Sequence, residues 1–170
     1  MTAQILIVDD HEVLREGLKS LLAKSRPDWL ICGEATDGEQ AIHLAQELKP
    51  DVIILDITMP RMSGLEAASR MRKMGLNIPV LIFTTHHSGR LDAEVRQAGA
   101  QGYVLKSQAA QSLVLAVDIV LAGGTFFGAP TETGAHRRRQ AEPRSPVLSR
   151  LRSCSLRLFR RRTNAGAGPR

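Results

Sequence analysis

Aromatic residues and cysteine are both scarce in this chain, and each shortage narrows the choice of fold. One Trp, one Tyr and four Phe make up 4% of the 170 residues, against a hydrophobic content of 43%. We therefore expect a core of Ile, Leu, Val and Ala. The two cysteines, Cys32 and Cys154, lie far apart and match no metal-ligand spacing, so nothing in the sequence indicates an oxidising compartment. We expect Cys32 to pack as a small apolar residue.

The sequence also lacks the pattern of a signal peptide or a membrane span. The first four residues carry no basic charge, and the first apolar run ends at two aspartates. The apolar stretch at residues 113–121 is too short to cross a bilayer and contains Asp118. We expect a cytoplasmic protein that does not insert into membranes.

Lysine and acidic residues become rare after residue 130. Residues 1–130 hold 12 basic and 15 acidic residues, a net charge of −3, whereas residues 131–170 hold 11 and 2, a net charge of +9. The overall charge of +6 and the pI of about 10 therefore come from the C-terminal part. All eleven basic residues there are arginine, in a context rich in Gly, Ala and Pro. This composition is typical of a shifted reading frame through GC-rich DNA.

Four short apolar runs are each followed by a polar residue. The runs cover residues 5–8, 52–55, 80–83 and 103–105, and the residues that follow them are Asp9-Asp10, Asp56, Thr84 and Lys106. Short runs rich in β-branched residues, separated by stretches of helical period, are typical of buried parallel strands. The carboxyl ends of such strands lie on one edge of a sheet, where ligands bind. We therefore predict that three carboxylates, a hydroxyl and an ammonium group share one site.

Between these runs the apolar residues follow a helical period, and the sequence marks several helix ends. Asp37 with Gln40, and Ser63 with Glu66, have the spacing of capping boxes. Ser107 is a candidate cap for the last helix, which Gly123-Gly124 would close. A further strand fits residues 30–35.

Five strands that alternate with five helices predict an α/β fold, with a doubly wound parallel sheet and right-handed crossovers. In the flavodoxin-like strand order 2-1-3-4-5, the topological switch point lies between the first and third strands. Those are the strands that end at Asp9-Asp10 and at Asp56. The topology and the carboxylate pattern thus indicate the same crevice.

Carboxylates that are packed together repel one another, which raises their pKa values unless a cation offsets the charge. Oxygen ligands of this kind favour Mg²⁺ over zinc or a dedicated calcium site. Lys106 carries the sign of charge that three carboxylates require. The sequence therefore predicts a Mg²⁺ site with a lysine beside it.

Several residues near this site have ordinary structural interpretations when each is considered alone. Thr84 is then a β-branched strand residue, and Tyr103 is a packing residue with its hydroxyl at the rim. His86-His87 lacks a third ligand at a suitable spacing and is interpreted as a loop pair rather than a metal site. His11 is interpreted as the first residue of a helix and not as a catalytic base.

Taken together, these motifs resemble the receiver domain of a two-component response regulator. The matching motifs are Asp9-Asp10, the DITMP run at residues 56–60, Thr84, and the YVLK run at residues 103–106. The VDDHEVLREG run at residues 8–17 and the GEATDG run at residues 33–38 are similar to the branch that includes nitrate-response and nodulation regulators. The resemblance extends from about Ile5 to about Pro130.

The resemblance implies a role for each site residue. Asp56 would accept a phosphoryl group from a phosphohistidine on a sensor histidine kinase. Asp10, Asp56 and the backbone carbonyl of Thr58 would ligate Mg²⁺, with Asp9 contributing through water. The residues that bind the phosphoryl group or change conformation in response to it would be Thr84, Tyr103 and Lys106. A homodimer that forms on phosphorylation is a further expectation from the family.

The resemblance ends where a DNA-binding output module would be expected. In this family a helix-turn-helix module of roughly 60 residues, of the LuxR type, follows a linker. Only 24 residues follow Pro146 here, which is too few for that module. We therefore predict a receiver domain at residues 1–125, a linker at residues 126–146 and a basic tail at residues 147–170. We expect the tail to be disordered and to lack a complete helix-turn-helix.

Three other functions fit parts of the sequence. The chain could be an intact DNA-binding transcriptional regulator whose C-terminal DNA-binding segment is not recognised, or a stand-alone receiver that serves as a phosphate sink. A phosphohydrolase of the haloacid-dehalogenase type also uses an aspartate at a strand end. That family expects a second aspartate two residues after its nucleophile, where this chain has Thr58. The phosphoacceptor interpretation is therefore favoured over an enzyme.

Overall fold

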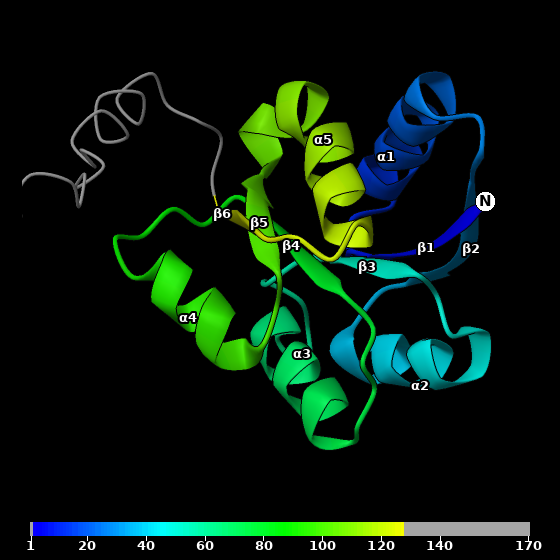
Figure 1. The fold of residues 1–170 in the computed structure, drawn as a ribbon. Coiled ribbons are helices and arrows are strands. Elements are labelled where there is room, and N and C mark those ends of the chain that lie inside the picture. The colour runs from blue at the N-terminus through cyan, green and yellow to red at the C-terminus, as the bar shows by residue number, and fades with distance from the viewer. Residues whose placement is uncertain (1, 128–170) are drawn as a thin grey trace, which may run out of the picture. The chain divides into compact units, whose positions relative to one another are not determined.

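The computed structural model describes residues 2–127, in which a parallel sheet lies between two layers of helices (Figure 1). The strands are β1 (Ala3–Val8), β2 (Trp29–Ala35), β3 (Val52–Leu55), β4 (Val80–Thr84), β5 (Gly102–Leu105) and β6 (Phe126–Phe127). The helices are α1 (Glu12–Ser25), α2 (Gly38–Leu48), α3 (Gly64–Lys73), α4 (Leu91–Ala98), the 3₁₀ turn η1 (Lys106–Gln108) and α5 (Ala109–Leu121). The predicted tail at residues 147–170, and the predicted linker from residue 128 onward, lie outside the described residues.

The strand order is β2-β1-β3-β4-β5-β6, and all neighbouring strands are parallel. The predicted α/β fold and the order 2-1-3-4-5 are therefore confirmed. The prediction of five strands was wrong, because β6 adds a sixth beside β5. A strand of two residues contains no alternation for a sequence pattern to detect. It also begins at Phe126, where the sequence predicted a linker.

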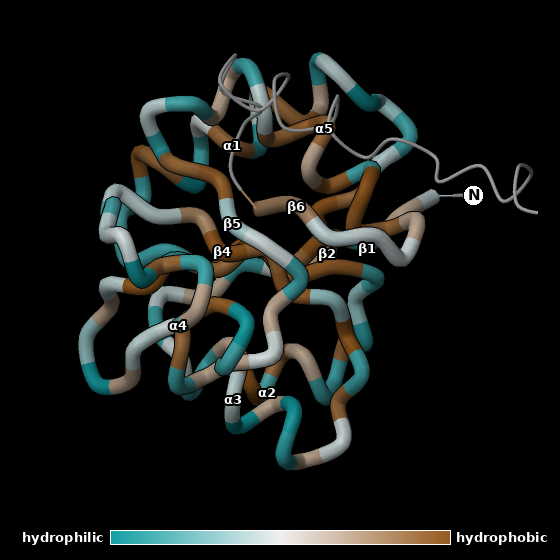
Figure 2. The backbone as a smooth tube through the Cα atoms, turned by 60° about the vertical axis from the view of Figure 1, so that its left-hand side comes forward, coloured by the Kyte–Doolittle hydropathy of each residue, from teal (hydrophilic) through white to brown (hydrophobic). Residues whose placement is uncertain are grey.

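Alternate residues of β1 face opposite layers of helices, which divides the core in two. Ile5 and Ile7 pack with buried residues of α1 and α5, whereas Leu6 and Val8 pack with buried residues of α2, α3 and α4. On the second side the fully buried side chains are aliphatic or methionine, as the scarcity of aromatics predicted. Figure 2 shows this core as hydrophobic colour along the central strands. Within residues 2–127, no helix has both the length and the apolar character that a membrane span requires.

Two of the predicted helix caps are confirmed and one is wrong. The Asp37 side chain accepts a hydrogen bond from the Gln40 backbone N–H at 2.9 Å, and Ser63 accepts one from Glu66 at 3.3 Å. Ser107 does not cap α5, because it lies inside η1 and the helix begins two residues later. The chain makes a tight turn directly after β5, which occupies the position where a cap would lie.

Candidate functional site

The carboxyl ends of β1, β3 and β5 bring three charged side chains together. Asp9 follows β1, Asp56 follows β3, and Lys106 follows β5. The Lys106 Nζ lies 2.6 Å from Asp9 Oδ2 and 2.9 Å from Asp56 Oδ2. The ammonium group therefore sits between two carboxylates that are 47 residues apart in the sequence. This arrangement is the convergence that the strand-end pattern predicted.

Backbone contacts fix the position of Asp56. Its N–H donates to the carbonyl of Val8 at 2.9 Å, which ties the end of β3 to the end of β1. Gly64 packs directly beneath it: a Cβ atom at Gly64 would lie only 1.9 Å from the Asp56 carbonyl oxygen. The Gly64 N–H also donates to Ile57 O at 2.9 Å. Sequence reasoning missed Gly64, and its only signal is a glycine next to the helix cap Ser63.

Burial shifts the pKa values of the charged side chains at this site. The side chains of Asp9, Asp56 and Lys106 are only 1%, 3% and 7% exposed. Burial raises the pKa of Asp56, and the charge of Asp9 adds to the rise, while Lys106 and a backbone hydrogen bond from Thr58 oppose it. Burial alone would lower the pKa of Lys106, but Asp9 and Asp56 outweigh it and the net direction is upward. Lys106 therefore stays protonated at neutral pH.

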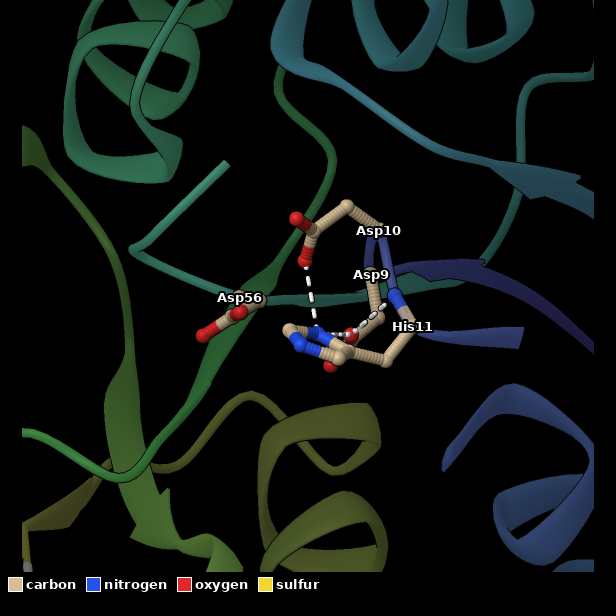
Figure 3. A group of neighbouring side chains, drawn as sticks. All are labelled: Asp9, Asp10, His11 and Asp56. Atoms are coloured by element: carbon tan, nitrogen blue, oxygen red, sulfur yellow. Dashed lines mark hydrogen bonds and ion pairs between the residues drawn. The ribbon is translucent and has the colours of Figure 1, made fainter. Parts of the chain in front are cut away.

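Asp10 and His11 complete a cluster on the outer side of these residues (Figure 3). One ligand atom from each of Asp9, Asp10, His11 and Asp56 lies within 4.8 Å of the others. The His11 Nδ1 lies 2.8 Å from Asp10 Oδ1 and 3.2 Å from Asp9 Oδ1. His11 is the N-cap residue of α1, one position before the helix begins, whereas the sequence predicted it as the first helical residue. Its imidazole turns back toward the carboxylates. Its position directly after two aspartates was the only sequence signal for this contact.

The cluster has the donors and the charge that a hard divalent cation requires. Three carboxylates face one lysine, so the group has an excess of negative charge. Asp9 Oδ2 is buried and makes no hydrogen bond, although Lys106 Nζ is close to it. Mg²⁺ prefers carboxylate oxygens as ligands and usually keeps several water molecules. Asp10 is more exposed than Asp9, so water can reach an ion bound there. The residues present therefore fit a Mg²⁺ site, with Thr58 in the adjoining loop.

The remaining predicted residues lie around the cluster rather than in it. Thr84 is fully buried at the end of β4, and its Oγ1 accepts a hydrogen bond from the His86 backbone N–H at 3.0 Å. Tyr103 is partly exposed, and its ring lies edge-on to that of Phe127. Burial and the nearby carboxylate of Asp92 raise the pKa of Tyr103. In this conformation Tyr103 therefore interacts with α4 and β6.

Comparisons with known proteins identify the family of this domain. The response regulator receiver domain model matches residues 5–118. The transcriptional regulatory protein YdfI of Bacillus subtilis is 42% identical over 124 residues, which cover 73% of this chain and 57% of that protein. The nitrate/nitrite response regulator NarL of Escherichia coli is 39% identical over 121 residues, which cover 71% of this chain and 56% of that protein.

A solved structure of a LuxR-family two-component response regulator from Aurantimonas has a TM-score of 0.72 and 36% identity. The match covers 81% of this chain and 99% of that one. The chain spans little more than half the length of the two curated relatives above. This chain belongs to the response regulator receiver domain family and is related to transcriptional regulators of the LuxR and NarL group.

Proposed function

We propose that Asp56 is the phosphoryl acceptor of this receiver domain, with the phosphohistidine of a sensor histidine kinase as donor. The observation that carries the proposal is a buried Asp56 carboxylate 2.9 Å from the Lys106 ammonium, beside Asp9 and Asp10. Asp9, Asp10, Asp56 and the Thr58 backbone carbonyl would hold Mg²⁺. We further propose a cytoplasmic location, where such a kinase would present its phosphohistidine.

The proposed reaction needs no general base, because a carboxylate is already a nucleophile when it is ionised. An Asp56 carboxylate oxygen attacks the phosphorus, and a new O–P bond forms as the P–N bond to the kinase histidine breaks. The departing imidazole then takes a proton from solvent. Lys106 favours the ionised form of Asp56 and stabilises charge on the transferred phosphoryl oxygens. When bound, Mg²⁺ supplies further positive charge to those oxygens. In this proposal the chain assists its own phosphorylation and dephosphorylation.

Phosphorylation would then act on Thr84 and Tyr103. A phosphoryl group on Asp56 adds negative charge and acceptor oxygens at the end of β3. The Thr84 hydroxyl would leave the His86 N–H and bond to the phosphoryl group, and Tyr103 would turn into the vacated space. This change reshapes the face made by α4, β5 and α5 by shifting a pre-existing equilibrium between two conformations.

The direct test is incubation of the purified chain with acetyl phosphate and Mg²⁺, followed by intact mass spectrometry. The chain should gain the mass of one phosphoryl group, and alkaline hydroxylamine should remove it. Asp56→Asn should abolish the gain. Asp51→Asn, at the exposed residue directly before β3, is the matched control and should retain it. A modification that persists in Asp56→Asn would exclude Asp56 as the acceptor.

We also propose that the regulatory output is transcriptional in origin, because the related YdfI of Bacillus subtilis is a transcriptional regulatory protein. The chain would act through a homodimer that forms on phosphorylation, or as a stand-alone receiver that drains phosphoryl groups from a kinase. A mobility-shift experiment at physiological salt distinguishes these possibilities. A sequence-specific DNA complex supports the intact transcriptional regulator, whereas binding that any polyanion displaces supports the stand-alone receiver.

A further inference from the structure

The last described strand holds an aromatic side chain between the proposed switch residue and α4. Tyr103 of β5 and Phe127 of β6 are register partners. Their ring centroids are 6.2 Å apart and the planes meet at 76°, an edge-to-face contact. On α4, the guanidinium carbon of Arg96 lies 3.6 Å from the Phe127 ring centroid. Phe127 therefore touches both the strand and the helix that would move on phosphorylation.

The backbone of β6 is docked closely against β5. The Phe126 N–H donates to Gln101 O at 2.9 Å. A Cβ atom at Gly102 would lie 1.8 Å from the Phe126 carbonyl oxygen, so only glycine permits this approach. The two side chains of β6 face opposite ways: Phe126 packs with the buried residues of α1 and α5, and Phe127 with those of α2, α3 and α4. Figure 1 shows β6 beside β5 at the edge of the sheet.

We propose that phosphorylation of Asp56 undocks β6 from the edge of the sheet. The proposal rests on the function proposed above, and in particular on the inward turn of Tyr103. That turn removes the edge-to-face contact that Phe127 makes in the conformation described here. Because β6 is only two residues long, few contacts hold it, and the Tyr103–Phe127 contact is one of them.

The coupling must also act in reverse. If switching weakens β6 docking, docked β6 opposes switching by the same factor, since linkage between two equilibria is reciprocal. One aromatic pair at a partly exposed site corresponds to a change of about two- to tenfold in an equilibrium constant. β6 would thus set how readily the domain responds to phosphorylation.

Hydrogen exchange of the full chain tests the first half of the proposal. Beryllium fluoride with Mg²⁺ serves as the phosphoryl mimic, and fluorine NMR reports its occupancy at Asp56. At saturation the Phe126 amide, which is protected by Gln101 O, should exchange about two- to tenfold faster. An unchanged exchange rate at full occupancy overturns the proposal and leaves the phosphoacceptor function intact. A mimic that does not bind overturns that function and, with it, this inference.

Two variants test the reverse coupling. Phe127→Ala and Arg96→Gln each remove one side of the contact, and each should raise the affinity for the mimic about two- to tenfold. Arg72→Gln is the matched control. Arg72 lines a surface cavity of about 390 Å³ together with Arg96 and Phe127, but it makes no stacking contact with Phe127. It should bind the mimic as the unaltered chain does.

A purely structural role for Phe127 would lower stability without changing the affinity for the mimic. Wild-type affinity in a folded Phe127→Ala chain therefore overturns the proposal. Arg96 is exposed on α4, so Arg96→Gln keeps the test decisive if Phe127→Ala fails to fold. In that case, unchanged affinity in Arg96→Gln is the overturning result.

Discussion

Asp56 occupies a position that opposes its own ionisation. Its side chain is buried, so the protonated form is favoured in the folded state relative to the unfolded one. Lys106 offsets this effect only in part, because the same ammonium group also pairs with Asp9. The residue that the proposed chemistry depends on is therefore destabilising in the unmodified domain at neutral pH.

We expect Asp56→Asn to be more stable than the unaltered chain by about 1–2 kcal/mol at about pH 7 without divalent ions. The raised pKa means that Asp56 favours folding below pH 3.8, its ordinary value, and that this contribution is lost as the pH rises through the folded-state pKa. The stability difference should therefore narrow as the pH falls toward 3.8. Urea unfolding across this pH range measures it, and a less stable Asp56→Asn chain at neutral pH would contradict the argument.

Lys106, in contrast to Asp56, should stabilise the folded domain at neutral pH. Lys106→Met leaves two buried carboxylates without their shared cation, which should raise the pKa of Asp56 further and destabilise the domain by about 3 kcal/mol at neutral pH. The loss should shrink in acid, where the carboxyl groups are protonated, and Mg²⁺ should recover part of it. Lys106→Arg keeps the charge and is the control. Equal stability of Lys106→Met and the unaltered chain would argue against a shared ion pair.

At the scale of elements, the two confirmed caps differ in how much they should stabilise the domain. Asp37 is buried, accepts from Gln40 at 2.9 Å and pairs with Arg61, whereas Ser63 accepts from Glu66 at 3.3 Å and is less buried. We expect Asp37→Ala to lower the free energy of unfolding by about 2 kcal/mol and Ser63→Ala by about 0.5 kcal/mol. Thermal or urea unfolding gives both values, and the reverse ranking would refute the comparison.

The junction between β3 and α3 should be sensitive to a single methyl group. Gly64→Ala places a Cβ 1.9 Å from the Asp56 carbonyl, so the backbone must move and carry Asp56 with it. We expect a loss of about 1–3 kcal/mol and slower phosphorylation by acetyl phosphate. Gly17→Ala is the control, because nothing lies within 4 Å of a Cβ there and helix propensity should make it neutral or stabilising. Phosphorylation of Gly64→Ala at the ordinary rate would show that Asp56 had not moved.

Helices and strands could be predicted from the sequence where burial determines the residue types at several consecutive positions. β1, β3 and β4 are apolar runs buried on both faces, and their composition indicates strands without further information. β6 escaped prediction because two residues have no period, and its pairing depends on the missing side chain at Gly102. Ser107 has a residue type favoured at caps, but the 3₁₀ turn after β5 overrode that local preference.

At the scale of the whole molecule, topology explains why much of the site was predictable. Parallel strands end on one edge, so the carboxylates that follow the neighbouring strands β1 and β3 had to converge. β4 lies between β3 and β5, and Lys106 reaches both carboxylates through its long side chain. The turn of the His11 imidazole toward the carboxylates depends on its side-chain rotamer. The close approach of Gly64 to the Asp56 carbonyl depends on the path of the backbone. The sequence pattern contains neither. The contact between Tyr103 and Phe127 likewise requires a strand that the sequence did not reveal.

Both halves of the core and the acidic cluster lie within residues 2–127. A chain that ends at residue 130 should therefore unfold at nearly the same urea concentration as the full chain and accept the same phosphoryl group. Its net charge would be −3 instead of +6. Retention on heparin should be lost in the shorter chain and should weaken with salt in the full one. A large drop in stability on shortening would show that later residues contribute to the core.

β6 also bears on which sequences can follow this receiver domain. The described domain ends in a strand of two residues, anchored by one aromatic side chain in each half of the core. Because β6 consists of Phe126 and Phe127 alone, we expect a different sequence fused after residue 127 to leave the rest of the core and the acidic cluster intact, provided that both phenylalanines and Gly102 are kept.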